Sequence, residues 1–150
     1  MLVLSLKFEG LVINKQPRIQ VLFEVKALNI KTMIDFLADT GALYSGITEK
    51  EAVIMGIDCS SLPYHKKEAV GFGGTFRNRI INRLVVLTFK SNQDVHQIKC
   101  SSFIVTCIPP DIRGEAREKM LRYTPNVLGM DILSKFKVCI NRNHVELVTW

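Results

Sequence analysis

Asp39, Thr40 and Gly41 form the stretch of this 150-residue chain whose residue types best suit chemistry. They follow a short, mostly apolar run, 34–38, which has the length of a buried strand, and their types are those that end a strand in a turn. A carboxyl group held on such a turn is a candidate general acid or base. An Asx turn that only closes a core strand has the same sequence. The triplet alone therefore leaves both interpretations open.

Two later motifs favour the chemical interpretation. One reads Val-Gly-Phe-Gly-Gly-Thr at 70–75, and the other reads Asn-Val-Leu-Gly-Met-Asp-Ile-Leu at 126–133. With the Asp39 triplet, and in this order, they resemble the retropepsin-like aspartic proteases over residues 18–150. In that family a strand delivers an Asp-Thr-Gly catalytic loop, a glycine-tipped hairpin covers the substrate, and two apolar residues followed by glycine pass beside the loop.

The resemblance implies an aspartic endopeptidase that hydrolyses peptide bonds. Two carboxyl groups share a proton across a bound water, one acting as base on the water while the other polarises the scissile carbonyl. The chain offers only Asp39 in the required loop, so the resemblance implies a homodimer whose twofold axis places each Asp39 opposite its copy. It implies a peptide or protein substrate, and neither a metal nor another cofactor.

The resemblance also assigns supporting roles. Thr40 would bond to the loop of the other protomer, and Gly41 would allow close approach of the backbone. The expected substrate-binding flap consists of Gly71, Phe72, Gly73 and Gly74, and the expected loop support consists of Thr40, Gly41, Ala42, Leu128 and Gly129. Asp131 is expected to cap a helix or to lie on the surface. Leu43 stands where viral relatives often carry an aspartate that holds the substrate backbone, which favours more apolar subsites.

Composition predicts a single domain, residues 1–150. The hydrophobic content of 47% suits one compact core, and no repeat, low-complexity segment or Pro/Ser-rich linker divides the chain. The scattered cysteines, at 59, 100, 107 and 139, suit reduced thiols, with a disulfide pair as the alternative. The N-terminal apolar run is too short for a signal peptide, and no stretch has the length of a membrane span. We therefore expect a cytoplasmic protein without a membrane partner.

The remaining polar residues point to no other chemistry. The formal net charge is +6, but the basic residues are spread apart from a loose cluster within 77–83, so nucleic acid is not an expected partner. His65, His96 and His144 lack the spacing of metal ligands. Ser45 lacks the glycine context of a nucleophilic serine.

The hydrophobic pattern predicts a mainly β protomer, which the resemblance makes a retropepsin-like closed barrel (the acid protease fold) with a flap hairpin and one or two short helices. Strands are expected at 2–8, 19–25, 32–38, 83–89, 98–108, 136–140 and 144–149. Thr48 and Glu51 predict a capping box for a short helix over 47–55, which Gly56 ends. A longer helix is expected over 111–123. It belongs to a helical insertion, 109–125, whose role as lid, dimer contact or surface decoration is open.

A second class of function fits the same resemblance. The fold could serve as a dimerisation or peptide-binding module with little or no proteolytic activity. The intact Asp39-Thr40-Gly41 triplet favours the enzyme, because a module under no catalytic demand need not keep it.

Ala42 generates a prediction on pH dependence. A serine or threonine there, usual in pepsin-type sequences, can donate a hydroxyl hydrogen bond that favours the charged form of the catalytic carboxyls, and alanine cannot. We expect a bell-shaped rate profile in the weakly acidic to near-neutral range and a shift towards acid in Ala42→Ser. The measurement is kcat/KM against pH for both proteins, on a substrate that does not titrate in this range. A strongly acidic optimum in the wild type, or a basic shift in the variant, would contradict this expectation.

Overall fold

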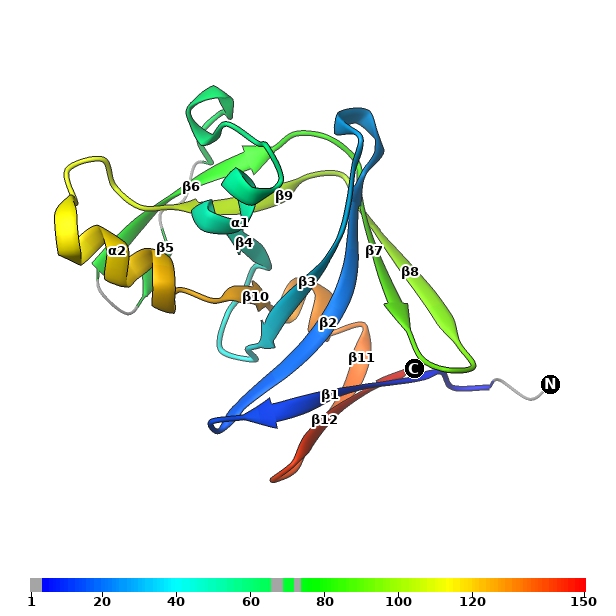
Figure 1. Ribbon diagram of the computed structural model, residues 1–150. Coiled ribbons are helices and arrows are strands. Elements are labelled where there is room, and N and C mark those ends of the chain that lie inside the picture. Colours follow the sequence, from blue (N-terminus) through cyan, green and yellow to red (C-terminus); the bar gives the residue numbers. More distant parts are fainter. Residues whose placement is uncertain (1–3, 66–68, 72–73) are drawn as a thin grey trace.

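The computed structural model describes residues 4–65, 69–71 and 74–150, and strands dominate it (Figure 1). In chain order the strands are β1 (Lys7–Ile13), β2 (Gln16–Val25), β3 (Ile30–Ala38), β4 (Gly46–Thr48), β5 (Ala69–Gly71), β6 (Gly74–Ile81), β7 (Val85–Lys90), β8 (Val95–Cys100), β9 (Phe103–Cys107), β10 (Asn126–Leu128), β11 (Phe136–Ile140) and β12 (His144–Thr149). The helices are α1 (Glu49–Ile54), α2 (Gly114–Tyr123) and α3 (Met130–Leu133), with 3-10 turns η1 (Lys26–Leu28) and η2 (Cys59–Ser61). The prediction of a mainly β chain with few helices is confirmed.

The strands pair in the order β11-β12-β1-β2-β3-β10-β4-β9-β6-β5, and β7 joins both β2 and β8. Most neighbours are antiparallel, but β10 runs parallel to β3 and β4 runs parallel to β9. The path ends at β11 on one side and at β5 on the other, so the pairing of the described strands leaves the sheet open. The closed barrel expected from the sequence is therefore not shown.

The β2–β3 hairpin forms the central part of the hydrophobic core. Its two strands pair from Arg18 opposite Leu37 to Val25 opposite Ile30. Phe23 and Phe36 are completely buried, one on each strand. Burying one such side chain contributes about 1.5–3 kcal/mol. The hairpin therefore anchors the end of β3, after which Asp39 follows.

Two of the expected strands depart most from their predicted boundaries. Among the described residues the first strand covers 7–13, whereas residues 2 and 3 of the expected strand 2–8 lie outside the described part of the chain. The strand extends to Ile13 because the chain reverses in a tight turn at Asn14 and Lys15, whose φ angles are 52° and 64°. Positive φ at both central residues is the geometry of a two-residue hairpin turn. The expected strand 98–108 is really β8 and β9, which the pair Ser101 and Ser102 separates. The longer helix starts at Gly114 instead of 111.

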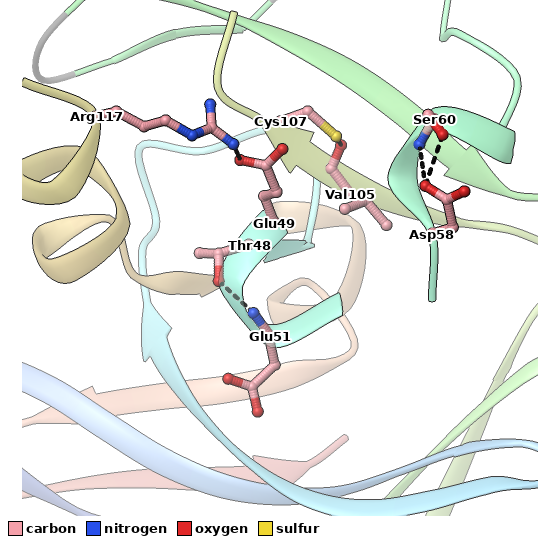
Figure 2. Close-up of polar contacts among 8 residues, drawn as sticks. All are labelled: Thr48, Glu49, Glu51, Asp58, Ser60, Val105, Cys107 and Arg117. Carbon is pink, nitrogen blue, oxygen red and sulfur yellow. Dashed lines mark hydrogen bonds and ion pairs between the residues drawn. The ribbon is translucent and has the colours of Figure 1, made fainter. Parts of the chain in front are cut away.

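The remaining predicted elements lie close to their expected places. The hairpin of β11 and β12 has the predicted boundaries, and a single helical turn follows Gly129. In α1 the hydroxyl of Thr48 accepts a hydrogen bond from the Glu51 backbone N at 3.2 Å (Figure 2). The Thr48 backbone N donates to Oδ1 of Asn126 at 2.9 Å. The second half of the predicted capping box is thus replaced by a bond to β10.

The α1 cap generates a stability prediction. Thr48→Val removes the capping hydroxyl at nearly constant volume and should lower the free energy of unfolding by about 1 kcal/mol. Glu51→Ala should cost only roughly 0.3 kcal/mol, from the lost interaction with the helix dipole. Urea unfolding of both variants and the wild type measures the two losses. Equal losses would mean that the Glu51 carboxylate completes the capping box after all.

Candidate active site

The parallel pairing of β3 with β10 fixes the position of Asp39. Leu128 lies opposite Ala38, and the Asp39 backbone N donates to the Leu128 carbonyl at 3.0 Å. Phe36 and Ala38 are buried, so the end of β3 is held by the core. Asp39 is half-buried, and Thr40, the next residue, is exposed. The carboxyl group thus lies at the junction between the buried end of β3 and the exposed loop.

The loop itself is an Asx turn. Oδ1 of Asp39 accepts a hydrogen bond from the Gly41 backbone N at 2.9 Å, and the Asp39 carbonyl accepts one from the Ala42 backbone N at 3.2 Å. These bonds orient the carboxylate while leaving it partly open to solvent. The two interpretations of the triplet are therefore compatible, because the turn that ends the strand also presents the carboxyl group.

Leu128 and Gly129 lie directly behind the loop. Leu128 is fully buried. A Cβ atom on Gly129 would lie 2.7 Å from the carbonyl carbon and oxygen of Tyr44 and 2.8 Å from the carbonyl oxygen of Ala42. These are backbone atoms, which cannot move aside as a flexible side chain could. Only glycine fits at this crossing of two chain segments.

A pair formed by the buried Ser45 and the solvent-exposed Asp131 braces the same crossing. The Ser45 hydroxyl donates to Oδ1 of Asp131 at 2.6 Å, and the Ser45 backbone N donates to both carboxylate oxygens, at 3.0 and 3.1 Å. The Gly129 backbone N donates to the Ser45 hydroxyl at 2.9 Å. Asp131 also accepts from the Ile132 backbone N at 2.9 Å, within the first turn of α3, whose N-cap is Gly129. No local sequence pattern indicates this pair, because its members stand 86 residues apart.

Two polar contacts tie the helices to these strands. The Asn126 side chain accepts from the Thr48 backbone N at 2.9 Å and donates to the Asp35 carbonyl at 3.3 Å. Arg117, on α2, forms an ion pair with Glu49 at 2.7 Å, which joins α2 to the start of α1 (Figure 2). No residue of α2 is buried. The insertion is thus a surface element fastened beside the strand that leads into Leu128.

The expected flap is an antiparallel hairpin of β5 and β6, with Gly71 opposite Gly74. Phe72 and Gly73, the expected tip, lie outside the described residues. Arg79 fixes the root of the hairpin. Its guanidinium donates to the Leu62 carbonyl and to the Tyr64 hydroxyl, each at 2.7 Å, and lies 4.0 Å from the Tyr64 ring centroid.

A cavity of about 180 Å³ lies between the segment after the loop and the root of the flap. Two residues that line it, Tyr44 and His65, pack edge to face, with ring centroids 6.1 Å apart. Its lining consists of Tyr44, Ser45, His65, Ile80, Cys100, Ser102, Phe103, Ile104 and Asp131. The fold thus brings the segment after Asp39, the root of the β5–β6 hairpin and Asp131 around one hollow.

The four cysteines differ in how their thiols are held. All four are unpaired. A hydrogen bond shared with Cys59 raises the pKa of the Cys107 thiol far above its ordinary value and lowers the pKa of Cys59. Burial raises the pKa of Cys100. In the part of the chain that the structure describes, no group of three or more His, Cys, Asp or Glu residues is arranged to hold a metal ion.

Comparison with known proteins identifies the fold. No protein-family model matches the chain, and no curated protein matches its sequence. A retropepsin-like aspartic protease from Rickettsia conorii has a similar structure, with a TM-score of 0.54 and 22% identity, over 97% of this chain and 99% of that one. EIAV protease complexed with the inhibitor HBY-793 gives a TM-score of 0.44 and 21% identity, over 81% of this chain and 88% of that one.

The likeness to the Rickettsia conorii protein defines the class of structure: the chain has the retropepsin-like fold. The Rickettsia conorii protein and this chain match over nearly their whole lengths, so the fold accounts for the chain from β1 to β12. The expectation that the sequence motifs gave for the fold family is confirmed.

The Ser45–Asp131 pair generates a stability prediction with a matched control. Ser45→Ala leaves an Asp131 carboxylate and the Gly129 N–H without their buried partner and should lower the free energy of unfolding by about 1–3 kcal/mol. Ser60 donates to Asp58 at the same distance of 2.6 Å, but that pair is exposed (Figure 2). Ser60→Ala should therefore cost no more than roughly 0.5 kcal/mol. Urea unfolding compares the variants, and similar losses would show that the Ser45–Asp131 pair does not brace the loop.

Proposed function

We propose that this protein is an aspartic endopeptidase that acts as a homodimer. The observation that carries the proposal is the Asp39 turn: a half-buried carboxyl at the end of a core strand, backed by Gly129, in a retropepsin-like fold. One Asp39 acts as base on a water molecule, and the other, protonated, polarises the scissile carbonyl. Two carboxyls this close hold one proton between them, because both cannot be charged cheaply.

Each chain contributes half of this site. Thr40 and Gly41 are exposed on the single chain, as a loop that meets its copy across a twofold axis would be. The Thr40 hydroxyl would bond to the backbone of the partner's loop and hold both carboxyls in register. Ala42, Leu128 and Gly129 fix the loop from behind through backbone contacts, so the half-site is rigid before the two copies meet.

The substrate would be an extended peptide bound beneath the β5–β6 hairpin. A peptide can add to such a hairpin as a further strand, with backbone hydrogen bonds supplying affinity and pockets for its side chains supplying selectivity. The cavity beside Tyr44 is a candidate for one such pocket. Leu43 is largely exposed next to the loop and favours apolar side chains nearby. Gly71, Phe72, Gly73 and Gly74 would close over the bound peptide.

We place this activity in the cytoplasm, where thiols stay reduced, since all four cysteines are unpaired. Among the described residues, no helix is long and apolar enough to cross a membrane. The site needs no metal or other cofactor, because the two carboxyls supply both the acid and the base.

Asp39→Asn provides the direct test. Loss of the ionisable group should reduce cleavage of a diverse peptide library by at least about 10³-fold, while the circular dichroism spectrum stays unchanged. Asp35→Asn is the matched control: Asp35 lies four positions earlier on β3, on an exposed face where it pairs with Arg18 at 3.1 Å. The control should keep nearly full activity, and a statine-type inhibitor should block that activity. Substantial turnover by Asp39→Asn would exclude the mechanism, and peptide binding without cleavage by the wild type would favour a binding module.

A further inference from the structure

We propose that Cys59 and Cys107 form a redox site, in which a peroxide joins the two thiols in a reversible disulfide that pins η2 to the end of β9. Neither residue belongs to the Asp39 loop or to the lining of the cavity beside it. The inference goes beyond the proposed protease and does not depend on it.

The two thiols are in contact, although they lie far apart in the sequence. They share a hydrogen bond. Both belong to the hydrophobic core, where Cys59 is 9% exposed and Cys107 is 5% exposed. The Cys107 thiol also lies 3.7 Å from the Val105 carbonyl oxygen, which helps to fix the direction of its side chain. Thiols that are already hydrogen-bonded need only a small further movement to reach the roughly 2 Å separation of a disulfide.

The packing of the surrounding elements places the same two residues together. α1 contacts both η2 and β9. Arg79 lies on β6, the strand that pairs with β9, and its guanidinium donates to the carbonyls of Ser60 and Leu62, at 3.2 and 2.7 Å. These bonds hold η2, which contains Cys59, against the strand pair that contains Cys107.

The hydrogen bond between the thiols gives them different roles. It outweighs the effect of burial and lowers the pKa of Cys59, while it raises the pKa of Cys107. Because the thiolate is the form that attacks an oxidant, Cys59 is the thiol that reacts first. Cys59 lies on a three-residue turn whose other members, Ser60 and Ser61, are exposed. A local opening of this turn lets a small oxidant in.

The reaction needs two steps and one molecule of peroxide. The Cys59 thiolate attacks one peroxide oxygen, the O–O bond breaks, and the departing hydroxide takes up a proton to become water. Cys59 is then a sulfenic acid. The Cys107 sulfur attacks the Cys59 sulfur, the S–O bond breaks, and the oxygen leaves as a second water with the Cys107 proton. Two thiols are oxidised to a disulfide, and the peroxide is reduced to two waters.

The disulfide would close a loop that contains the β5–β6 hairpin. In the reduced protein, hydrogen bonds hold the root of this hairpin. The His65 backbone N donates to the Asn78 carbonyl at 2.8 Å, and the Ile80 backbone N donates to the Pro63 carbonyl at 2.9 Å. A covalent bond from η2 to β9 would add a restraint that local opening does not break. Disulfides in reducing compartments are mostly transient and redox-sensing, which suits a bond that forms only when peroxide appears.

Mass spectrometry tests the site. Cys139→Ser is the starting protein, because it lacks the exposed thiol that could join two chains. After hydrogen peroxide at neutral pH its mass should fall by about 2 Da, the loss of two hydrogen atoms, and dithiothreitol should restore it. Non-reducing peptide maps should contain one crosslink, between Cys59 and Cys107. Cys100→Ser in the same background is the matched control and should form the crosslink equally, since Cys100 lies on β8 and lines the cavity instead.

Two further measurements test the order of reaction and the pinning of η2. Cys107→Ser in the same background should stop Cys59 at the sulfenic acid, which dimedone captures, without the loss of about 2 Da. Amide hydrogen exchange of residues 59–65 should slow at least about fivefold in the crosslinked protein, because η2 no longer opens on its own. Circular dichroism checks folding, and the peptide map of the wild type decides if a serine variant fails to fold.

The outcomes separate this inference from the proposed function. Survival of both thiols under conditions that fully oxidise Cys139 in the wild type would overturn the inference. A crosslink that includes Cys100, or further oxidation of Cys59 without a crosslink, would also overturn it. Unchanged hydrogen exchange in the crosslinked protein would show that η2 is not pinned. A protein that forms the crosslink but cleaves no peptide would refute the protease and support the redox site.

Discussion

The crossing of two chain segments at Gly129 is the contact on which the rest of this molecule depends. Here β10 lies parallel to β3, and its continuation passes so close to Ala42 and Tyr44 that no side chain fits between them. Backbone groups that approach so closely must satisfy one another, since water has no room to enter. The Asp39 and Met130 backbone nitrogens meet this need by donating to carbonyls across the crossing. These hydrogen bonds therefore hold the Asp39 loop rigidly against the core.

At this crossing a polar network joins the buried Ser45 to the solvent-exposed carboxylate of Asp131. Ser45 is only 3% exposed, and its hydroxyl both donates to Asp131 and accepts from Gly129. A network of this kind stabilises a structure only when each member is paired, and removing one member leaves the others unpaired at a cost. Its benefit is geometric. Hydrogen bonds fix distances and directions, whereas apolar contacts tolerate sliding. A loop that presents a carboxyl group needs the fixed distances and directions that hydrogen bonds provide.

The sequence predicted those parts of the molecule whose signals are local. The turn at Asp39, the strand before it, the cap at Thr48 and the β11–β12 hairpin each follow from neighbouring residues. The predicted boundaries of the first strand were wrong because the turn at Asn14 and Lys15 has positive φ angles but contains no glycine that would indicate them. The Ser45–Asp131 pair has no local signature at all, since only the complete fold brings those two residues together. Barrel closure is likewise a property of strand pairing, and the pairing of the described strands leaves the sheet open.

The rigid Asp39 loop would also reduce what two copies of the chain must do to associate. The bonds that hold the Asp39 turn lie within one chain, so the half-site is formed in the monomer and would not have to fold at the interface. Ordering flexible segments during binding consumes part of the interaction energy, and a preorganised loop avoids that cost. A contact between two copies would then not have to supply the energy of ordering this loop.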